Sequence, residues 1–369
     1  MPRSTALAVT IVLFPLVGCG FAPAGSGGAG AASGGPLGTG NASGAGLVGG
    51  GAAQNGQGNV TGMNCREVMQ PLAKLPPDIL IILDASGSMN DDATNTSCGT
   101  AGCGATSKWA QMIPAINQVV MATDMTVNWG LKFFADTDST CGVGNGVAVP
   151  VGTNTATAVG TAITGRTSAN GGVSNGSRTP TRLAENAGAA YMRGLTDQNP
   201  KFIVLATDGL PNCAASGATD ADDSPGAVTA VTDAAMGGIP TFVVGIATGG
   251  GMADATLSNM ANAGGYPRAG SPSYYPVTST TDLVATLQTL VGMATTCTFT
   301  VPEPTGDTDR SHIAVVVNGS ELGRDPNHAN GWDYTSTGMT AVQIYGSTCT
   351  GIMNGSITDV KIVFKCIIN

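Results

Sequence analysis

Apolar runs that alternate with stretches of helical periodicity occupy the chain from residue 78 to residue 293. The first run, at residues 79–83, has the length and β-branched content of a strand buried on both faces. Further strands are expected at residues 127–134, 147–151, 202–206, 240–246 and 275–277, with the second of these pairing antiparallel to the first. Helical patterns fall at residues 108–122, 155–163, 181–193, 225–236, 252–261 and 281–293. This alternation predicts an α/β fold with a doubly wound, mostly parallel sheet.

The last part of the chain breaks this alternation. Short strand patterns at residues 314–317, 342–345 and 360–364 are separated by turns rich in glycine and asparagine. We therefore expect a small, all-β C-terminal appendage. The expected division of the chain is 1–18, 19–62, 63–295 and 296–369, of which 63–295 is the α/β domain and 296–369 the β-rich region.

The N-terminus has the pattern of an export signal. Arg3 precedes an apolar stretch at residues 6–17, which is too short for a membrane-spanning helix. The sequence that follows, Leu16-Val17-Gly18-Cys19, resembles the lipobox of bacterial lipoproteins, which implies cleavage before Cys19 and lipid attachment to it. The alternative is a simple signal peptide with a chance cysteine. Because no aspartate follows Cys19, the resemblance favours the outer membrane over the inner membrane.

The composition limits the classes of partner that the chain is expected to bind. Residues 19–62 are almost entirely Gly, Ala, Ser and Asn, so they predict a flexible tether. Only 11% of the 369 residues are charged and the formal net charge is -9, which argues against a nucleic-acid partner, because such a partner requires clustered Lys and Arg. The same charge balance disfavours an electrostatic membrane patch. Any membrane contact is therefore expected through the N-terminal lipid alone.

Three oxygen-bearing side chains follow the first apolar run at alternate positions. Asp84 ends the run, and Ser86 and Ser88 come directly after it. Open α/β sheets bind their ligands at the carboxyl ends of the strands, which is where this motif would lie. One carboxylate and two hydroxyls are hard ligands that suit Mg²⁺ or Mn²⁺. The motif therefore predicts a divalent-cation site at this edge of the sheet.

Two distant segments extend the motif. A later apolar run ends in Thr207-Asp208-Gly209, and Thr179 lies between the two runs, just before a helical pattern. Asp84-x-Ser86-x-Ser88, Thr179 and Asp208, in this order, resemble the metal-ion-dependent adhesion site of the von Willebrand factor type A domain. The alternative is that these residues are only helix caps and turn formers.

The resemblance implies both a fold and a function. It implies that five side chains hold Mg²⁺, or Mn²⁺ or Ca²⁺: Asp84, Ser86, Ser88, Thr179 and Asp208. In that family a carboxylate from the partner completes the coordination of the ion. The implied function is non-catalytic, metal-dependent binding of a protein or surface polymer by a domain anchored in the cell envelope. The alternative is a structural component of the envelope in which the metal only stabilises the fold.

Eight cysteines remain beside Cys19, and an even number in an exported chain predicts disulfides. They are Cys65, Cys98, Cys103, Cys141, Cys213, Cys297, Cys349 and Cys366. Cys98 and Cys103 are close in sequence, and Cys141 and Cys213 both fall in loops at the predicted metal end. Cys65 and Cys297 bracket the α/β domain, which would leave Cys349 to pair with Cys366. Pairing of Cys65 with a tail cysteine is the open alternative.

One motif points to a different class of function. Ser174 lies in a Gly-x-Ser-x-Gly sequence, which matches the nucleophile elbow of serine hydrolases. That elbow needs a strand before the serine and a helix after it, whereas residues 167–171 are loop-like. The only histidines are His312 and His328, and both lie in the tail. We therefore expect a non-enzymatic protein and treat a hydrolase as a distant third reading.

Overall fold

The computed structural model describes residues 68–137, 140–174, 178–215, 219–305, 308–335, 337–353 and 356–366. The side chain of Cys366 lies outside this description. The expected signal peptide, Cys19 and the tether all precede residue 68, so they also lie outside the described residues.

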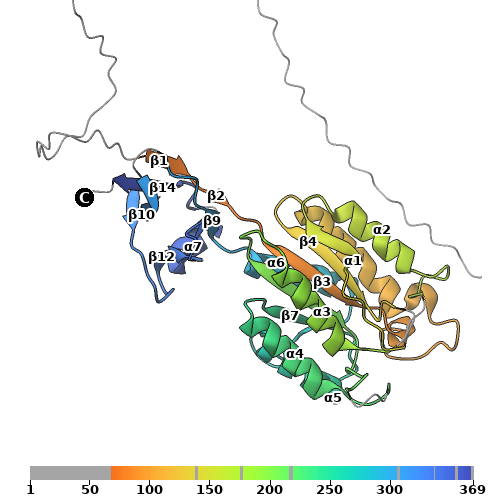
Figure 1. Cartoon of the computed structure of the whole chain (residues 1–369). Coiled ribbons are helices and arrows are strands. Elements are labelled where there is room, and N and C mark those ends of the chain that lie inside the picture. Colours follow the sequence, from red (N-terminus) through yellow and green to blue (C-terminus); the bar gives the residue numbers. More distant parts are fainter. Residues whose placement is uncertain are drawn as a thin grey trace, which may run out of the picture. The chain divides into compact units, whose positions relative to one another are not determined.

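A six-stranded sheet with the order β5-β4-β3-β6-β7-β8 forms the centre of the α/β domain (Figure 1). Its strands are β3 (Asp78–Asp84), β4 (Asn128–Phe134), β5 (Val149–Gly152), β6 (Lys201–Thr207), β7 (Thr241–Ile246) and β8 (Tyr275–Val277). All neighbouring pairs are parallel except β4 with β5, which is antiparallel. The expected strands and the antiparallel edge pair are therefore confirmed.

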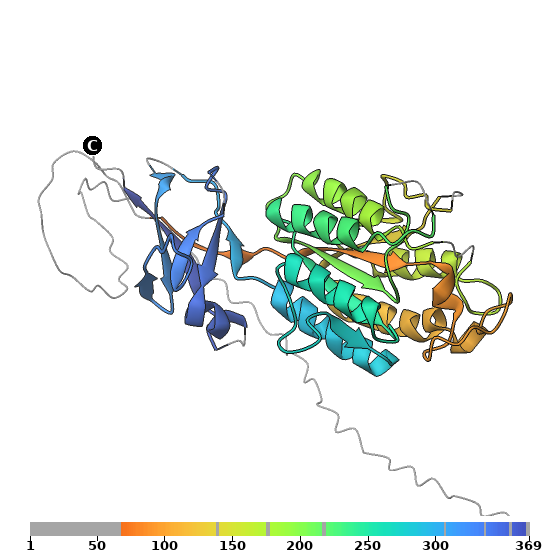
Figure 2. The same ribbon diagram turned by 90° about the horizontal axis from the view of Figure 1, so that it is seen from below.

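Six helices cover the two faces of this sheet (Figure 2). One face packs against α1 (Lys108–Thr123), α2 (Ala156–Arg166) and α6 (Thr280–Ala294). The other packs against α3 (Thr181–Arg193), α4 (Ser224–Met236) and α5 (Met252–Ala263). Two short 3₁₀ helices, η1 (Gly87–Asn90) and η2 (Gly104–Thr106), precede α1. This is the doubly wound α/β fold expected from the sequence.

The apolar run in β3 explains why this strand is central. Ile79, Ile81 and Leu83 face the α1 side, while Leu80 and Ile82 face the α3 side, and all are buried. A strand with no polar position in this stretch can only lie where helices cover both faces. The sequence of β3 therefore fixes Asp84, at its end, over the middle of the sheet.

The β-rich region contains two four-stranded antiparallel sheets, with the orders β1-β14-β10-β11 and β12-β13-β9-β2. The N-terminal pair is β1 (Val68–Pro71) and β2 (Ala73–Lys74). The later strands are β9 (Thr298–Thr300), β10 (Thr308–Val317), β11 (Ser320–Leu322), β12 (Gly331–Tyr334), β13 (Ala341–Tyr345) and β14 (Val360–Cys366). One helix, α7 (Gly346–Met353), joins β13 to β14.

The pairing of β1 and β2 differs from the expected division at residue 63. These two strands come before the α/β domain in the chain, yet they pair with β14 and β9, which come after it. Because the paired strands are more than two hundred residues apart in sequence, local sequence patterns give no signal for their pairing. The β-rich region is thus formed from both flanks of the α/β domain.

Three disulfides are present among the described residues: Cys98–Cys103, Cys141–Cys213 and Cys297–Cys349. The first two are as expected. The third corrects two expectations, the pairs Cys65–Cys297 and Cys349–Cys366. Cys297 directly precedes β9 and lies in the core of the β-rich region, and Cys349 lies in α7, which packs against that core. Cys65 lies outside the described residues, so its pairing with a tail cysteine stays a prediction.

None of the helices in the described part of the chain is long and apolar enough to cross a membrane.

Candidate functional site

The candidate site lies where the direction of strand addition reverses. The chain proceeds from β3 to β4 on one side and later returns to place β6 on the other side of β3. Helices leave the carboxyl ends of β3 and β6 toward opposite faces, and such switch points are where open α/β sheets form ligand crevices. Asp84 ends β3 and Asp208 directly follows β6. Two carboxylates that are 124 positions apart in sequence thus meet at one edge.

Asp84 is fully buried and held by both of its carboxylate oxygens. Oδ1 accepts a hydrogen bond of 2.8 Å from the backbone N–H of Ser86, which turns the chain back over the end of β3. Oδ2 accepts one of 2.5 Å from the hydroxyl of Thr207, the last residue of β6. The carboxylate is therefore positioned by its own loop and by the neighbouring strand.

A chain of hydroxyls joins the first motif to Asp208. The Ser86 and Ser88 hydroxyl oxygens lie 3.0 Å apart, and the Ser88 hydroxyl donates a 3.0 Å hydrogen bond to Oδ1 of Asp208. Hydrogen bonds thus link four of the five expected site residues, namely Asp84, Ser86, Ser88 and Asp208. The side chains of these four residues contribute only oxygen atoms as possible ligands.

Thr179 lies in the loop before α3 and reaches the same place by a different route. Its backbone N–H donates 2.7 Å to Oδ1 of Asn212, and its carbonyl accepts 3.0 Å from the Asn212 N–H. Asn212 belongs to the loop after β6, so these two hydrogen bonds join the two loops. Thr179, Ser88 and Asp208 line one cleft of about 430 Å³. All five residues are therefore at the same edge, with Asp84 buried beneath the cleft.

Lys108 is a component of the site that the motif does not include. It is the first residue of α1, its side chain is 1% exposed, and its Nζ donates 2.7 Å to Oδ2 of Asp208. Nζ also donates to Oδ1 of Asn95, which lines the cleft as well. A positive charge in the first turn of a helix is unfavourable because it opposes the helix dipole. A lysine at the start of the helical pattern is therefore a signal in the sequence for a nearby anion that compensates this charge.

The two carboxylates interact electrostatically. Burial, and after it the negative charge of Asp208, raises the pKa of Asp84 to about 7, although hydrogen bonds from Thr207 and Ser86 oppose this rise. Two buried carboxylates that face one another are unfavourable unless positive charge lies between or beside them. Lys108 supplies one such charge, and a divalent cation would supply more.

The residues present fit a hard divalent cation. The donor set contains two carboxylates and three hydroxyls and no nitrogen or sulfur ligand, which suits Mg²⁺, Mn²⁺ or Ca²⁺ rather than a softer ion. Within the described residues no group of three or more His, Cys, Asp and Glu side chains is arranged for a metal. Any ion at this edge would therefore depend on the hydroxyls of Ser86, Ser88 and Thr179.

The surroundings of Ser174 differ from a nucleophile elbow. Ser174 follows an isolated antiparallel bridge between Thr167 and Val173, and its N–H donates to the carbonyl of Arg166 at the end of α2. No strand of the central sheet leads into the serine, so the strand-to-turn-to-helix geometry that exposes a nucleophile is not formed.

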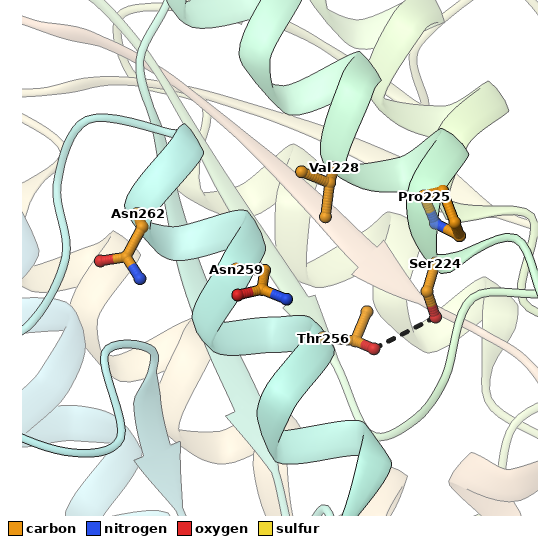
Figure 3. Close-up of a pocket in the computed structure, with 6 residues that line it drawn as sticks. All are labelled: Ser224, Pro225, Val228, Thr256, Asn259 and Asn262. Carbon is orange, nitrogen blue, oxygen red and sulfur yellow. Dashed lines mark hydrogen bonds between the residues drawn. The ribbon is translucent and has the colours of Figure 1, made fainter.

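A second cavity of about 520 Å³ lies between α4 and α5 (Figure 3). It is lined by Ser224, Pro225, Val228, Thr256, Asn259 and Asn262. The Thr256 hydroxyl donates 3.1 Å to the Ser224 hydroxyl across it. Because every lining side chain is neutral, this cavity offers no charged group that would anchor an ion.

No protein-family model and no curated protein matches the chain. Solved structures similar to it include the pilus adhesin SpaC of Lactobacillus rhamnosus GG, with 15% identity and a TM-score of 0.42 over 81% of this chain and 41% of SpaC. Proximal thread matrix protein 1 of the mussel byssus, with a zinc-occupied MIDAS motif, has 14% identity and a TM-score of 0.40 over 62% of this chain and 50% of that protein. Manganese-loaded Plasmodium vivax TRAP has 16% identity and a TM-score of 0.43 over 75% of this chain and 96% of TRAP. The chain thus spans half or less of the first two proteins.

Proposed function

We propose that this chain binds a divalent cation at the carboxyl edge of its central sheet and uses the ion to hold a carboxylate of a protein or surface polymer, without catalysis. The observation that carries the proposal is the linked set of buried carboxylates and hydroxyls from β3 and β6 beneath an open cleft. Mg²⁺ is the proposed ion, with Mn²⁺ or Ca²⁺ as substitutes.

The proposed role of each residue follows from its position. Asp84, Ser86 and Ser88 would hold the ion from the β3 side, and Asp208 and Thr179 would face it from the β6 side and the α3 loop. A bound divalent cation supplies a Lewis acid that attracts an anionic oxygen. The cleft beside Ser88 and Asp208 admits that oxygen from outside the protein. Because these loops are tied to strand ends, the chain presents a preformed binding surface.

The disulfides support a location outside the cytosol, where such bonds persist. We propose that the protein is exported and held in the bacterial cell envelope, on the outer membrane, by lipid attached to Cys19. The tether at residues 19–62 would then hold the binding cleft away from the membrane surface.

The test uses Mn²⁺ as the probe, because bound Mn²⁺ relaxes the protons of its coordinated water. Titrating Mn²⁺ into the full chain is expected to enhance water-proton relaxation, and added acetate is expected to reduce the enhancement as a carboxylate displaces water. The Asp84→Asn variant should show neither effect, while Ser174→Ala should show both. Enhancement that acetate leaves unchanged would favour a purely stabilising metal in an envelope component. No enhancement with the wild-type chain would contradict metal binding itself.

A further inference from the structure

The described part of the α/β domain contains two lysines that are almost completely buried, Lys108 and Lys132. Lys132 Nζ is accounted for locally, since it donates to Asp136 and to the carbonyls of Gly144 and Gly146 in the loop after β4. Lys108 instead points its charge at the candidate metal site. A buried ammonium is unfavourable unless a carboxylate pairs with it, so its position here requires an explanation.

The position of Lys108 is fixed from three directions. Its backbone follows the N-cap Ser107, and its N–H donates 2.8 Å to the carbonyl of Asp91. Its Nζ is held between Asp208 Oδ2 and Asn95 Oδ1. The ammonium is therefore a built-in part of the site and not a mobile surface charge.

Asn95 is itself locked in place. It has a left-handed backbone with φ of 61°, and its Nδ2 donates 2.7 Å to the carbonyl of Ala247 at the end of β7. The N–H of Cys103 donates to the carbonyl of Asn90, which closes the segment that carries Asn95, and the Cys98–Cys103 disulfide follows within the same insert. The insert between β3 and α1 thus serves to place one amide oxygen against the Lys108 ammonium.

The charge of the site follows from these contacts. Asp84 and Asp208 supply two negative charges and Lys108 supplies one positive charge, so the three fixed side chains sum to -1 when all are ionised. A divalent cation held there keeps a net positive charge of one. Without Lys108 the same ion would be neutralised by the protein alone, and it would attract an external carboxylate less strongly.

We propose that Lys108 is a resident counter-cation that weakens metal binding and leaves the bound ion dependent on an anionic ligand. This inference rests on the proposed function. In the metal-free protein the same ammonium stabilises the fold, because it neutralises Asp208 next to Asp84. Lys108 is therefore a positioning and affinity-setting residue and not a ligand of the ion.

The test compares Lys108→Met, Lys108→Gln and Lys132→Met with the wild type, each as the full chain. Calorimetric titration of Mn²⁺ is expected to give at least about tenfold tighter binding for both Lys108 variants, because one repulsive charge is removed. Thermal unfolding in the presence of a chelator should occur at lower temperature for these variants, and Mn²⁺ should restore more stability to them than to the wild type. Lys132→Met should be less stable with unchanged Mn²⁺ affinity.

The two proposals fail in different ways. Unchanged or weaker Mn²⁺ affinity in Lys108→Gln, whose amide keeps a hydrogen-bond donor, would overturn the counter-cation role while leaving the metal site intact. No Mn²⁺ binding by the wild type together with none in either Lys108 variant would overturn the proposed function as well. Binding that appears only in the variants would support the counter-cation role but overturn the proposed function, because Lys108 would then block the ion in the wild-type chain.

Discussion

The hydroxyl of Thr207 donates a 2.5 Å hydrogen bond to Oδ2 of Asp84, so the last residue of β6 positions the carboxylate at the end of β3. Both residues are fully buried. This contact joins the two strands at the level of the candidate site. Thr207 is therefore as much a part of the site as Asp208, the residue that follows it.

Replacing Thr207 by valine tests this contact, because valine keeps the shape of the side chain and removes the donor. We expect Thr207→Val to weaken Mn²⁺ binding by about tenfold, since a partner that orients a metal ligand has effects of this size. Calorimetric titration measures the change. Thr229→Val is the matched control, because its hydroxyl bonds to the carbonyl of Pro225 on the exposed side of α4. Equal affinity in both variants would show that Asp84 needs no support from β6.

Glu185 on α3 gives a prediction for the pH dependence of stability. Burial raises the pKa of this carboxyl to about 7 from an ordinary value of 4.5, and the hydrogen bond from Thr241 offsets only part of the rise. Its second oxygen, Oε2, is buried without a hydrogen-bond partner in the described structure. The folded protein therefore binds a proton that the unfolded chain releases between these two pH values.

It follows that the free energy of unfolding contributed by Glu185 decreases as the pH rises from about 4.5 to about 7 and is constant above that. Glu185→Gln removes this titration and should reduce the slope of this part of the curve, so that the variant gains about 3 kcal/mol relative to the wild type between pH 4.5 and pH 8. Urea unfolding across this pH range measures it. Glu303→Gln, whose side chain is exposed, should leave the slope as in the wild type. If the free energy of unfolding of Glu185→Gln changed with pH as in the wild type, the pH dependence would arise from other groups.

The disulfides at the metal end should differ in their contribution to stability. Cys141–Cys213 joins the loops after β4 and β6 across 72 positions, whereas Cys98–Cys103 spans only 5. Loop-closure entropy predicts a loss of about 4 kcal/mol for Cys141→Ser with Cys213→Ser and about 2 kcal/mol for Cys98→Ser with Cys103→Ser. Denaturant unfolding of the two double variants gives the comparison. A larger loss of stability without Cys98–Cys103 than without Cys141–Cys213 would contradict this prediction. It would show that the short disulfide stabilises the fold by more than its loop length predicts, because it holds Asn95 and Lys108 in place.

Much of the α/β domain was predictable from local patterns. The uninterrupted apolar run before Asp84 can only be a strand covered on both faces, and the second run before Asp208 is of the same kind. Once both are parallel and adjacent, their carboxyl ends must meet. Residue type and strand direction place each carboxylate at the carboxyl edge, whereas the adjacency of the two strands was implied only by the resemblance of the motif to the von Willebrand factor type A site.

The features that were missed depend on contacts between distant segments. Asn95 reaches Lys108 only because the insert folds back onto β7, and no periodicity in that insert indicates this. The strands β1 and β2 pair with β14 and β9 across the whole α/β domain, and the four residues of β1 are too few to show a pattern. The Cys297–Cys349 bond was missed for the same reason, since α7 was not expected in the tail.

Calorimetric titration of Mg²⁺ and Mn²⁺ into the full chain, beside Asp84→Asn, Asp208→Asn and Ser174→Ala, tests the metal site most directly. Asparagine preserves the shape of each side chain and removes its charge. We expect one binding event in the wild type and in Ser174→Ala, with binding lost in both asparagine variants while the circular dichroism spectrum is unchanged. Binding by Asp84→Asn with wild-type affinity, or a folded wild-type chain that binds neither ion, would contradict a metal site at the ends of β3 and β6.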